Sequence, residues 1–197
     1  MWFNLVLTGA PGSGKGTQGR LLAKKYNLYY ISTGSLLRRE IKAGSEIGAK
    51  VKDIMDRGEL VPDEIVIRLI ESEIRQHNNV RGFVFKGFPR TIVQAYILDG
   101  LLRRLDSSVS YCIELNAPTI ESIKRLNARS KTPQARSYDM NTELIINRLE
   151  EYNEKTLPVA DFYNKQHKFA SLNAIGDEKL VFERLSEKVE AAMKMLR

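Results

Sequence analysis

Short apolar runs alternate along the chain with longer segments whose apolar residues recur at helical spacing. The runs predict buried strands at residues 3–8, 28–31, 83–85, 109–115 and 169–173. The periodic segments predict helices at residues 15–26, 35–42, 46–57, 63–76, 91–104, from 118 onward, 141–163 and 178–195. Strands that alternate with helices favour an α/β fold of three layers, with a five-stranded parallel sheet between two layers of helices.

Two stretches interrupt this alternation. Residues 32–61 read as helices without a strand, and residues 130–140 predict a loop. Because such sheets bind ligands where their strands end, we expect both stretches to rise as inserts from that rim. The predicted division is a core of residues 1–31, 62–129 and 141–197, a helical insert of residues 32–61 and a short loop of residues 130–140.

Composition narrows the class of protein. The 197 residues are 43% hydrophobic and 28% charged, which is ordinary for a globular protein. A net charge of +7 allows nucleic acid, an anionic membrane surface or small polyanions such as nucleotides as partners. The single cysteine, Cys112, excludes a disulfide framework within one chain and favours a reducing, cytoplasmic location. No apolar run approaches the roughly 18 residues of a membrane helix, and we expect neither a targeting segment nor membrane association.

The first predicted strand runs into a glycine-rich segment, Gly9-Ala10-Pro11-Gly12-Ser13-Gly14-Lys15-Gly16-Thr17, which opens the first predicted helix. Glycines let backbone N–H groups converge on phosphate oxygens, and the helix adds its positive end. Lys15 can reach the β and γ phosphates, and the Thr17 hydroxyl can hold Mg²⁺. A plain glycine turn is the alternative. The strand–loop–helix context favours a phosphate site made of Gly12, Ser13, Gly14, Lys15, Gly16 and Thr17.

Four further segments follow the loop in order: Ser32-Thr33-Gly34-Ser35-Leu36-Leu37-Arg38, Gly58-Glu59-Leu60-Val61-Pro62-Asp63, Gly87-Phe88-Pro89-Arg90-Thr91 with Gln94, and Arg148-Leu149 with Tyr152. Together with the loop, they resemble the nucleoside monophosphate kinases, most closely the short-lid adenylate kinases. The resemblance covers nearly the whole chain. It implies a P-loop NTPase core, a nucleoside-monophosphate-binding insert at residues 32–61 and a short lid at residues 130–140.

The resemblance also implies where AMP binds. The implied residues are Thr33, Gly34, Arg38, Glu59, Leu60, Val61, Gly87, Phe88, Pro89, Arg90, Gln94, Arg136 and Arg148. Arginine forks suit phosphate oxygens, and the Gln94 amide has both a donor and an acceptor for an adenine edge. Related pyrimidine monophosphate kinases usually carry Asn at the position of Gln94 and Ala at that of Thr33. These two residues therefore favour AMP over UMP or CMP.

For ATP, the resemblance implies that Arg125 and Arg129 flank the triphosphate and that the backbone of Gly176 contacts the adenine. The expected reaction moves the γ-phosphoryl group of ATP to AMP and gives two ADP. An AMP oxygen is already anionic, so catalysis needs in-line positioning and charge neutralisation. The residues expected to supply both are Lys15, Arg90, Arg125, Arg129 and Arg148.

Three positions depart from the family pattern. Lys86 stands where the family usually has Asp before Gly-Phe-Pro-Arg, and Ser35 where it usually has Asp after Ser-Thr-Gly. In the lid, the usual arginine is displaced to Arg136, and Met140 replaces the second of two acids. We therefore hypothesise that Mg²⁺ is held mainly by Thr17, nucleotide phosphates and water, with Lys86 supplying charge.

These departures keep two alternatives open: a nucleotide-binding protein with little catalysis, and a kinase of another nucleoside monophosphate. Two polyphosphate substrates account for the basic residues, so we expect no nucleic-acid partner, and we expect a monomer. His77 and His167 lie in polar contexts at helix ends and are expected to be solvated. Cys112 is expected in the core.

Overall fold

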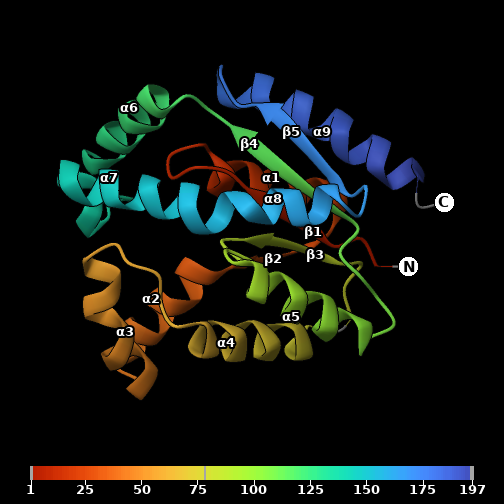
Figure 1. The fold of residues 1–197 in the computed structure, drawn as a ribbon, viewed down its shortest axis with the longest axis horizontal. Coiled ribbons are helices and arrows are strands. Elements are labelled where there is room, and N and C mark those ends of the chain that lie inside the picture. The colour runs from red at the N-terminus through yellow and green to blue at the C-terminus, as the bar shows by residue number, and fades with distance from the viewer. Residues whose placement is uncertain (1, 78, 196–197) are drawn as a thin grey trace.

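A five-stranded parallel sheet forms the centre of the computed structural model, which describes residues 2–77 and 79–195 (Figure 1). The strands lie in the order β2-β3-β1-β4-β5. They are β1 (Leu5–Thr8), β2 (Tyr29–Ser32), β3 (Phe83–Lys86), β4 (Tyr111–Asn116) and β5 (Phe169–Asn173). The helices are α1 (Lys15–Tyr26), α2 (Thr33–Ala43), α3 (Glu46–Asp56), α4 (Asp63–Gln76), α5 (Ile92–Arg103), α6 (Thr119–Ser130), α7 (Thr142–Glu151), α8 (Leu157–Asn164) and α9 (Glu178–Met195). The predicted three-layer α/β fold is confirmed.

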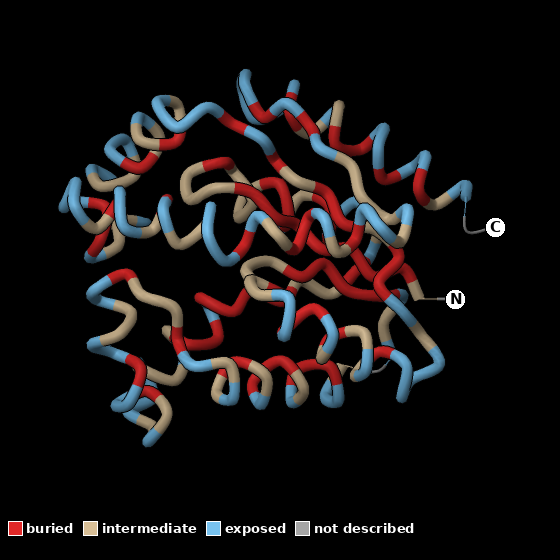
Figure 2. Tube along the Cα trace, viewed as in Figure 1, coloured by how far each residue is buried: buried red, intermediate tan, exposed pale blue. Residues whose placement is uncertain are grey.

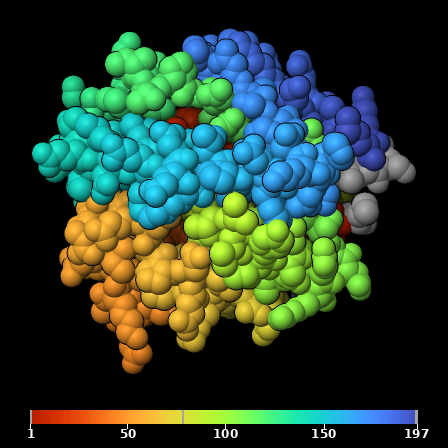
Figure 3. Space-filling view, in the orientation of Figure 1, coloured from red at the N-terminus to blue at the C-terminus, as the bar shows by residue number. Residues whose placement is uncertain are grey.

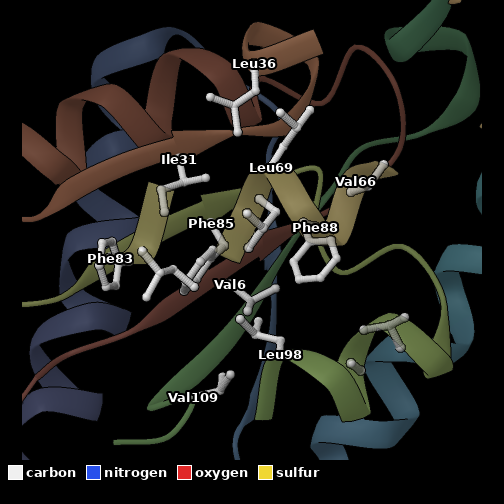
Figure 4. Packing of buried hydrophobic residues seen from close by; sticks show 14 of the residues in the cluster. Val6, Ile31, Leu36, Val66, Leu69, Phe83, Phe85, Phe88, Leu98 and Val109 are labelled. Carbon is white, nitrogen blue, oxygen red and sulfur yellow. The ribbon is translucent and has the colours of Figure 1, made fainter. Parts of the chain in front are cut away.

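The central strand β1 is buried on both faces, as its unbroken apolar run requires. Val6 packs on one side with Phe85 and with residues of α4, α5 and α8 (Figure 4). Leu5 and Leu7 pack on the other side with α1 and α9. Figure 2 shows the burial concentrated in the strands and on the inner faces of the helices. The inner face of α9 is an apolar stripe at helical spacing, made of Val181, Leu185, Val189 and Ala192.

The segment expected as one helix from residue 141 to 163 is instead two helices joined by a π turn at Tyr152–Thr156. Within this turn the N–H of Leu157 donates to the carbonyl of Tyr152, five residues back. Pro158 follows at once and has no N–H to continue the α-helical ladder. The prediction was therefore wrong in this middle turn, and a wider turn takes up the break.

The segment expected as a loop from residue 130 to 140 contains a 3₁₀ turn at Ser137–Met140. Two other boundaries moved slightly, since β4 begins at Tyr111 and α2 at Thr33. The helices α2 and α3 form a hairpin beyond the end of β2 (Figure 1). They approach each other closely at Gly48, where a side chain would meet the backbone of Glu40.

Across residues 2–77 and 79–195, each helix is too short or too polar to cross a membrane.

Candidate active site

The glycine-rich loop joins β1 to α1, and the backbone of neighbouring segments packs closely against it. Gly9 and Gly12 have positive φ values of 135° and 85°. A Cβ atom at Gly12 would lie 2.5 Å from the carbonyl oxygen of Ser122, and one at Gly9 equally close to that of Leu115. The loop therefore needs glycine at both positions. Its end is the first turn of α1, whose unpaired N–H groups and positive helix end suit an anion.

Lys15 folds back over this loop. Its Nζ atom donates to the carbonyl of Gly9, to the carbonyl of Ala10 at 2.7 Å and to the Ser13 hydroxyl at 3.1 Å. Burial, and then the positive charges of Arg90 and Arg148, lower the pKa of Lys15 to about 7. A phosphate in the loop would stabilise the ammonium form, because an anion offsets both effects.

A cleft of about 580 Å³, counted with its open mouth, lies beside the loop. It gathers predicted site residues from α2, α5 and α7, from the segment before α4, from the turn after β3 and from the residue before the 3₁₀ turn. Those that line it are Thr33, Gly34, Arg38, Glu59, Leu60, Val61, Gly87, Arg90, Gln94, Arg136 and Arg148. In Figure 3 the orange surface of α2 and α3 meets the teal surface of α7, and the Arg148 guanidinium joins the two by donating to the carbonyl of Gly58 at 2.9 Å.

Phe88 and Pro89 were expected to contact AMP, but they are absent from the cleft lining. The Phe88 ring is only 1% exposed and packs in the core with Val66 and Leu98 (Figure 4). The position of the ring has a physical reason, since an apolar ring is stabilised by burial against the sheet. Phe88 anchors the turn that carries Gly87 and Arg90.

Five residues line the cleft that the site prediction did not include. They are Leu37, Met55, Val66, Lys86 and Tyr138. The three apolar residues match the helical spacing of core positions, so the sequence did not distinguish them from ordinary core residues. Tyr138 lies in the segment that was expected to be a loop, and only the 3₁₀ turn brings its ring over the cleft.

The amide of Gln94 is held in one orientation. Its Oε1 atom accepts from the N–H of Arg90 at 2.7 Å, and its Nε2 atom donates to Oδ1 of Asp63 at 2.6 Å. The hydroxyl of Thr91 caps α5 by accepting from the N–H of Gln94 at 3.1 Å. Gln94 is 3% exposed. The ends of the amide are therefore distinguished by fixed partners, and each retains capacity toward the cleft.

Arginines give the cleft a strong positive field. Arg90 donates from Nε to the carbonyl of Gly87 at 3.0 Å, and Arg148 lies over the Tyr138 ring at 4.0 Å. Burial, and then the charge of Arg148, lower the pKa of Arg90 to about 10. Arg136 donates to the Tyr138 hydroxyl at 2.9 Å. The displaced lid arginine thus lies in the cleft wall.

The residues expected around ATP lie on the other side of the loop. Arg125 donates to the carbonyl of Ala174 at 2.9 Å and lies 3.5 Å from that of Gly176, so these two predicted contacts come together. Arg129 instead forms a two-pronged ion pair with Asp139, at 2.7 and 2.6 Å. The Asp139 side chain is fully buried. This ion pair therefore holds the 3₁₀ turn against α6.

The donor set offers little for a metal held by protein alone. Within the part of the chain that the structure describes, no group of three or more His, Cys, Asp or Glu side chains could hold one. Ser35 donates to the Ser32 hydroxyl at 3.1 Å, and Lys86 brings an ammonium to the cleft. The Thr17 hydroxyl remains as the oxygen donor expected at the start of α1. These residues fit a Mg²⁺ ion that arrives on nucleotide phosphates, which is a common mode for this ion.

Of the three expectations that assigned no function to His77, His167 and Cys112, two are confirmed. Cys112 is fully buried in β4, and His167 is exposed. His77 is not simply solvated, because its ring stacks on Tyr29 at 3.7 Å between centroids and its Nδ1 atom lies 2.9 Å from the carbonyl of Glu73. The polar sequence around His77 concealed this contact, which comes from the packing of α4 against β2.

A phosphate loop at the end of a parallel strand, opening on a cationic cleft with an oriented amide, defines a P-loop phosphotransferase of the nucleoside monophosphate kinase type. The adenylate kinase family model matches residues 7–168, and the chain belongs to that family. It is 45% identical to an adenylate kinase of Flavobacterium psychrophilum, over 93% of this chain and 96% of that protein. It is 41% identical to an adenylate kinase of Parabacteroides distasonis, over 94% and 97% of the two chains. An adenylate kinase of Methanothrix thermoacetophila is 35% identical, over 93% and 97%.

Proposed function

We propose that this chain transfers the γ-phosphoryl group of ATP to AMP and produces two ADP. Family membership supports this reaction and disfavours a nucleotide-binding protein with little catalysis. The observation that carries the proposal is the cleft itself. It combines an oriented Gln94 amide with the guanidinium groups of Arg38, Arg90 and Arg148, beside the glycine-rich loop. A purine monophosphate has one edge for the amide and one dianion for the arginines.

In the proposed arrangement, ATP phosphates occupy the loop from Gly12 to Thr17, and the adenine of ATP lies near Arg125 and Gly176. The AMP phosphate faces Arg38, Arg90 and Arg148. Lys15 contacts the phosphates of ATP from within the loop. Since the attacking AMP oxygen is an anion, no general base is required. The cations then stabilise the charge that spreads over the transferred group in the transition state.

Adenylate kinases generally use ATP with Mg²⁺, and we propose the same for this chain. The Thr17 hydroxyl would be the protein ligand, with phosphate oxygens and water completing the coordination. When bound, the ion would neutralise part of the triphosphate charge. The remaining electrostatic stabilisation would come from the chain's own cations.

Gln94 supports AMP over pyrimidine monophosphates, because its amide keeps donor and acceptor capacity beyond its bonds to Arg90 and Asp63. The Thr33 hydroxyl donates to the carbonyl of Gly87 at 2.8 Å and so joins the insert to the turn carrying Arg90. A kinase of another monophosphate is therefore the weaker candidate.

A coupled assay with ATP and each of AMP, CMP, UMP and GMP, with and without Mg²⁺, tests the proposal. We expect ADP formation with AMP to exceed that with every other acceptor. Equal or faster reaction with CMP or UMP would contradict the AMP assignment, and no transfer to any acceptor would contradict the reaction class. A monomeric state and a cytoplasmic location complete the proposal, and sedimentation of the purified chain tests the first.

A further inference from the structure

Lys86 ends strand β3 at the rim that faces the cleft. It lies in register with Leu7 of β1 on one side and with Ser32 of β2 on the other. Leu7 is two residues from Gly9, so this position adjoins the start of the phosphate loop. The Lys86 side chain lines the cleft together with Arg38, Arg90 and Arg136. An ammonium at this rim therefore lies between the loop and the cleft arginines.

Among the described residues, no carboxylate forms a salt bridge with Lys86, and its ammonium donates no hydrogen bond to another side chain. Burial, and then the positive charges of Arg136, Arg90, Lys15 and Arg38, lower the pKa of Lys86 well below its usual value. Lys86 is half-buried, and an ammonium in such a site without an anion is costly, because it loses part of its hydration and gains no compensating charge. The positive charge of Lys86 is therefore uncompensated, and an anionic ligand would stabilise it.

Other cations around the cleft and the loop also lack a negatively charged partner. Two nearby arginines are already paired with acids, Arg125 with Glu121 and Arg129 with Asp139. Of the acids near the cleft, Glu59 pairs with Arg57 and Glu151 pairs with Lys155, while Asp63 accepts from the Gln94 amide at 2.6 Å. Within residues 2–77 and 79–195, six cations here have no salt-bridge partner: Lys15, Arg38, Lys86, Arg90, Arg136 and Arg148.

Metal-free nucleotides carry a matching charge. Near pH 7 a terminal phosphate has roughly two negative charges, so ATP has roughly four and AMP roughly two. Bound phosphates would keep Lys15 and Lys86 in their ammonium forms, and the six unpaired cations would then balance ATP and AMP together without a divalent ion. A carboxylate at the position of Lys86 would lower this positive charge by two, and that deficit is the charge of one divalent cation.

We propose that the Lys86 ammonium contacts the phosphates at the transfer point and supplies positive charge that a divalent cation would otherwise provide. Lys86 then raises the affinity for metal-free nucleotide and reduces the dependence of turnover on Mg²⁺. This inference rests on the proposed phosphoryl transfer for its catalytic half. Its binding half concerns ATP alone and can be measured separately.

Calorimetric titration of ATP in excess EDTA tests the binding half. We compare the parent chain with Lys86→Met, which removes the charge, and with Lys86→Arg, which keeps it. Lys24→Met is the matched control, because Lys24 is exposed on α1 and loses the same charge outside the cleft. Loss of one charged hydrogen-bonding group typically weakens binding by about ten- to a hundredfold. We expect a loss of that size for Lys86→Met and a change of less than about threefold for the other two.

The same titration with saturating Mg²⁺ separates the metal effect. The penalty of Lys86→Met should shrink, because the bound ion neutralises part of the phosphate charge. For Lys86→Asp, the Mg²⁺ concentration that gives half-maximal ADP formation should fall, while metal-free ATP binding should weaken further than in Lys86→Met. Circular dichroism melting of each variant confirms that it is folded before its affinity is compared.

Equal affinity of the parent chain and folded Lys86→Met for metal-free ATP would overturn the inference, whatever the kinase activity. An equal loss in Lys24→Met would also overturn it, because the effect would then be one of overall charge. By contrast, a tenfold loss confined to Lys86→Met in a chain that does not phosphorylate AMP would uphold the phosphate contact and reject the proposed reaction. The two failures are therefore distinguishable.

Discussion

Replacement of Asp63 by Leu should selectively weaken AMP binding, although Asp63 does not itself line the cleft. Asp63 begins α4, and its Oδ1 atom accepts from Nε2 of Gln94 at 2.6 Å. The carboxylate can only accept, and the N–H of Arg90 on the other side can only donate. Together they fix which end of the Gln94 amide is nitrogen. In the proposed AMP complex, the hydrogen and lone pair left over on that amide would match the N1 acceptor and the amino group of adenine.

The magnitude follows from the burial of this amide. A hydrogen bond to a charged group contributes about 1.5–3 kcal/mol, and the 3% exposure of Gln94 leaves no water to replace it. If that energy is lost from the oriented AMP site, the KM for AMP rises by about ten- to a hundredfold, since about 1.4 kcal/mol is a factor of ten. The KM for ATP should be unchanged, because the Asp63 side chain accepts from Gln94 and Thr91, which lie outside the glycine-rich loop.

Steady-state kinetics with AMP varied at saturating ATP measure this effect. Asp63→Asn should stay within about threefold of the parent KM for AMP, because its side-chain oxygen still accepts from Gln94. Glu64→Gln is the matched control for lost negative charge in the first turn of α4, and its carboxylate pairs instead with the exposed Arg68 at 2.8 Å. An unchanged KM for AMP in Asp63→Leu, or an equal rise in the KM for ATP, would refute the reasoning.

Three further predictions concern stability and reactivity. Gly48→Ala should lower the free energy of unfolding by about 1–3 kcal/mol in urea titration, because the added methyl would overlap the carbonyl of Glu40; an unchanged midpoint would contradict this close packing. Asp139→Ala should lower the free energy of unfolding by about 2–3 kcal/mol in the same assay. This is somewhat less than the loss of a fully buried ion pair, because the Arg129 side chain is 27% exposed. An unchanged free energy of unfolding would show that the pair contributes nothing to stability. Burial raises the pKa of Cys112 far above its usual value, so the thiolate is suppressed and a disulfide reagent at pH 8 should label the protein only after unfolding; prompt labelling of the folded chain would be inconsistent with this burial.

The sheet and the phosphate loop could be predicted because their signals are local. An apolar run such as that of β1 identifies a buried strand by itself, and the glycines of the loop are required by backbone conformation. The motif residues around Gly87 and Arg90 were identified by type and spacing. The burial of the Phe88 ring, in the middle of that motif, could not be predicted, because a motif does not indicate which side chains turn toward the core.

The remaining features depend on contacts between distant segments. The π turn at Tyr152–Thr156 could have been suspected from Pro158, but its position within the helix could not be predicted. The bond from Gln94 to Asp63 spans 31 residues, and neither residue's type indicates the other as its partner. For Lys86, the sequence revealed an unusual residue type. The absence of a neighbouring carboxylate among the described residues became visible only in the fold.

The proposed reaction requires the γ-phosphoryl group of ATP to pass to AMP, and the fate of a labelled phosphate tests this transfer most directly. ATP labelled in its γ-phosphate is incubated with unlabelled AMP and the purified chain, and the products are separated before equilibrium is reached. The proposed reaction predicts that the label appears in the β-phosphate of ADP, with two ADP formed for each ATP consumed. Label released as inorganic phosphate, or retained in ATP while AMP is unchanged, would contradict the account.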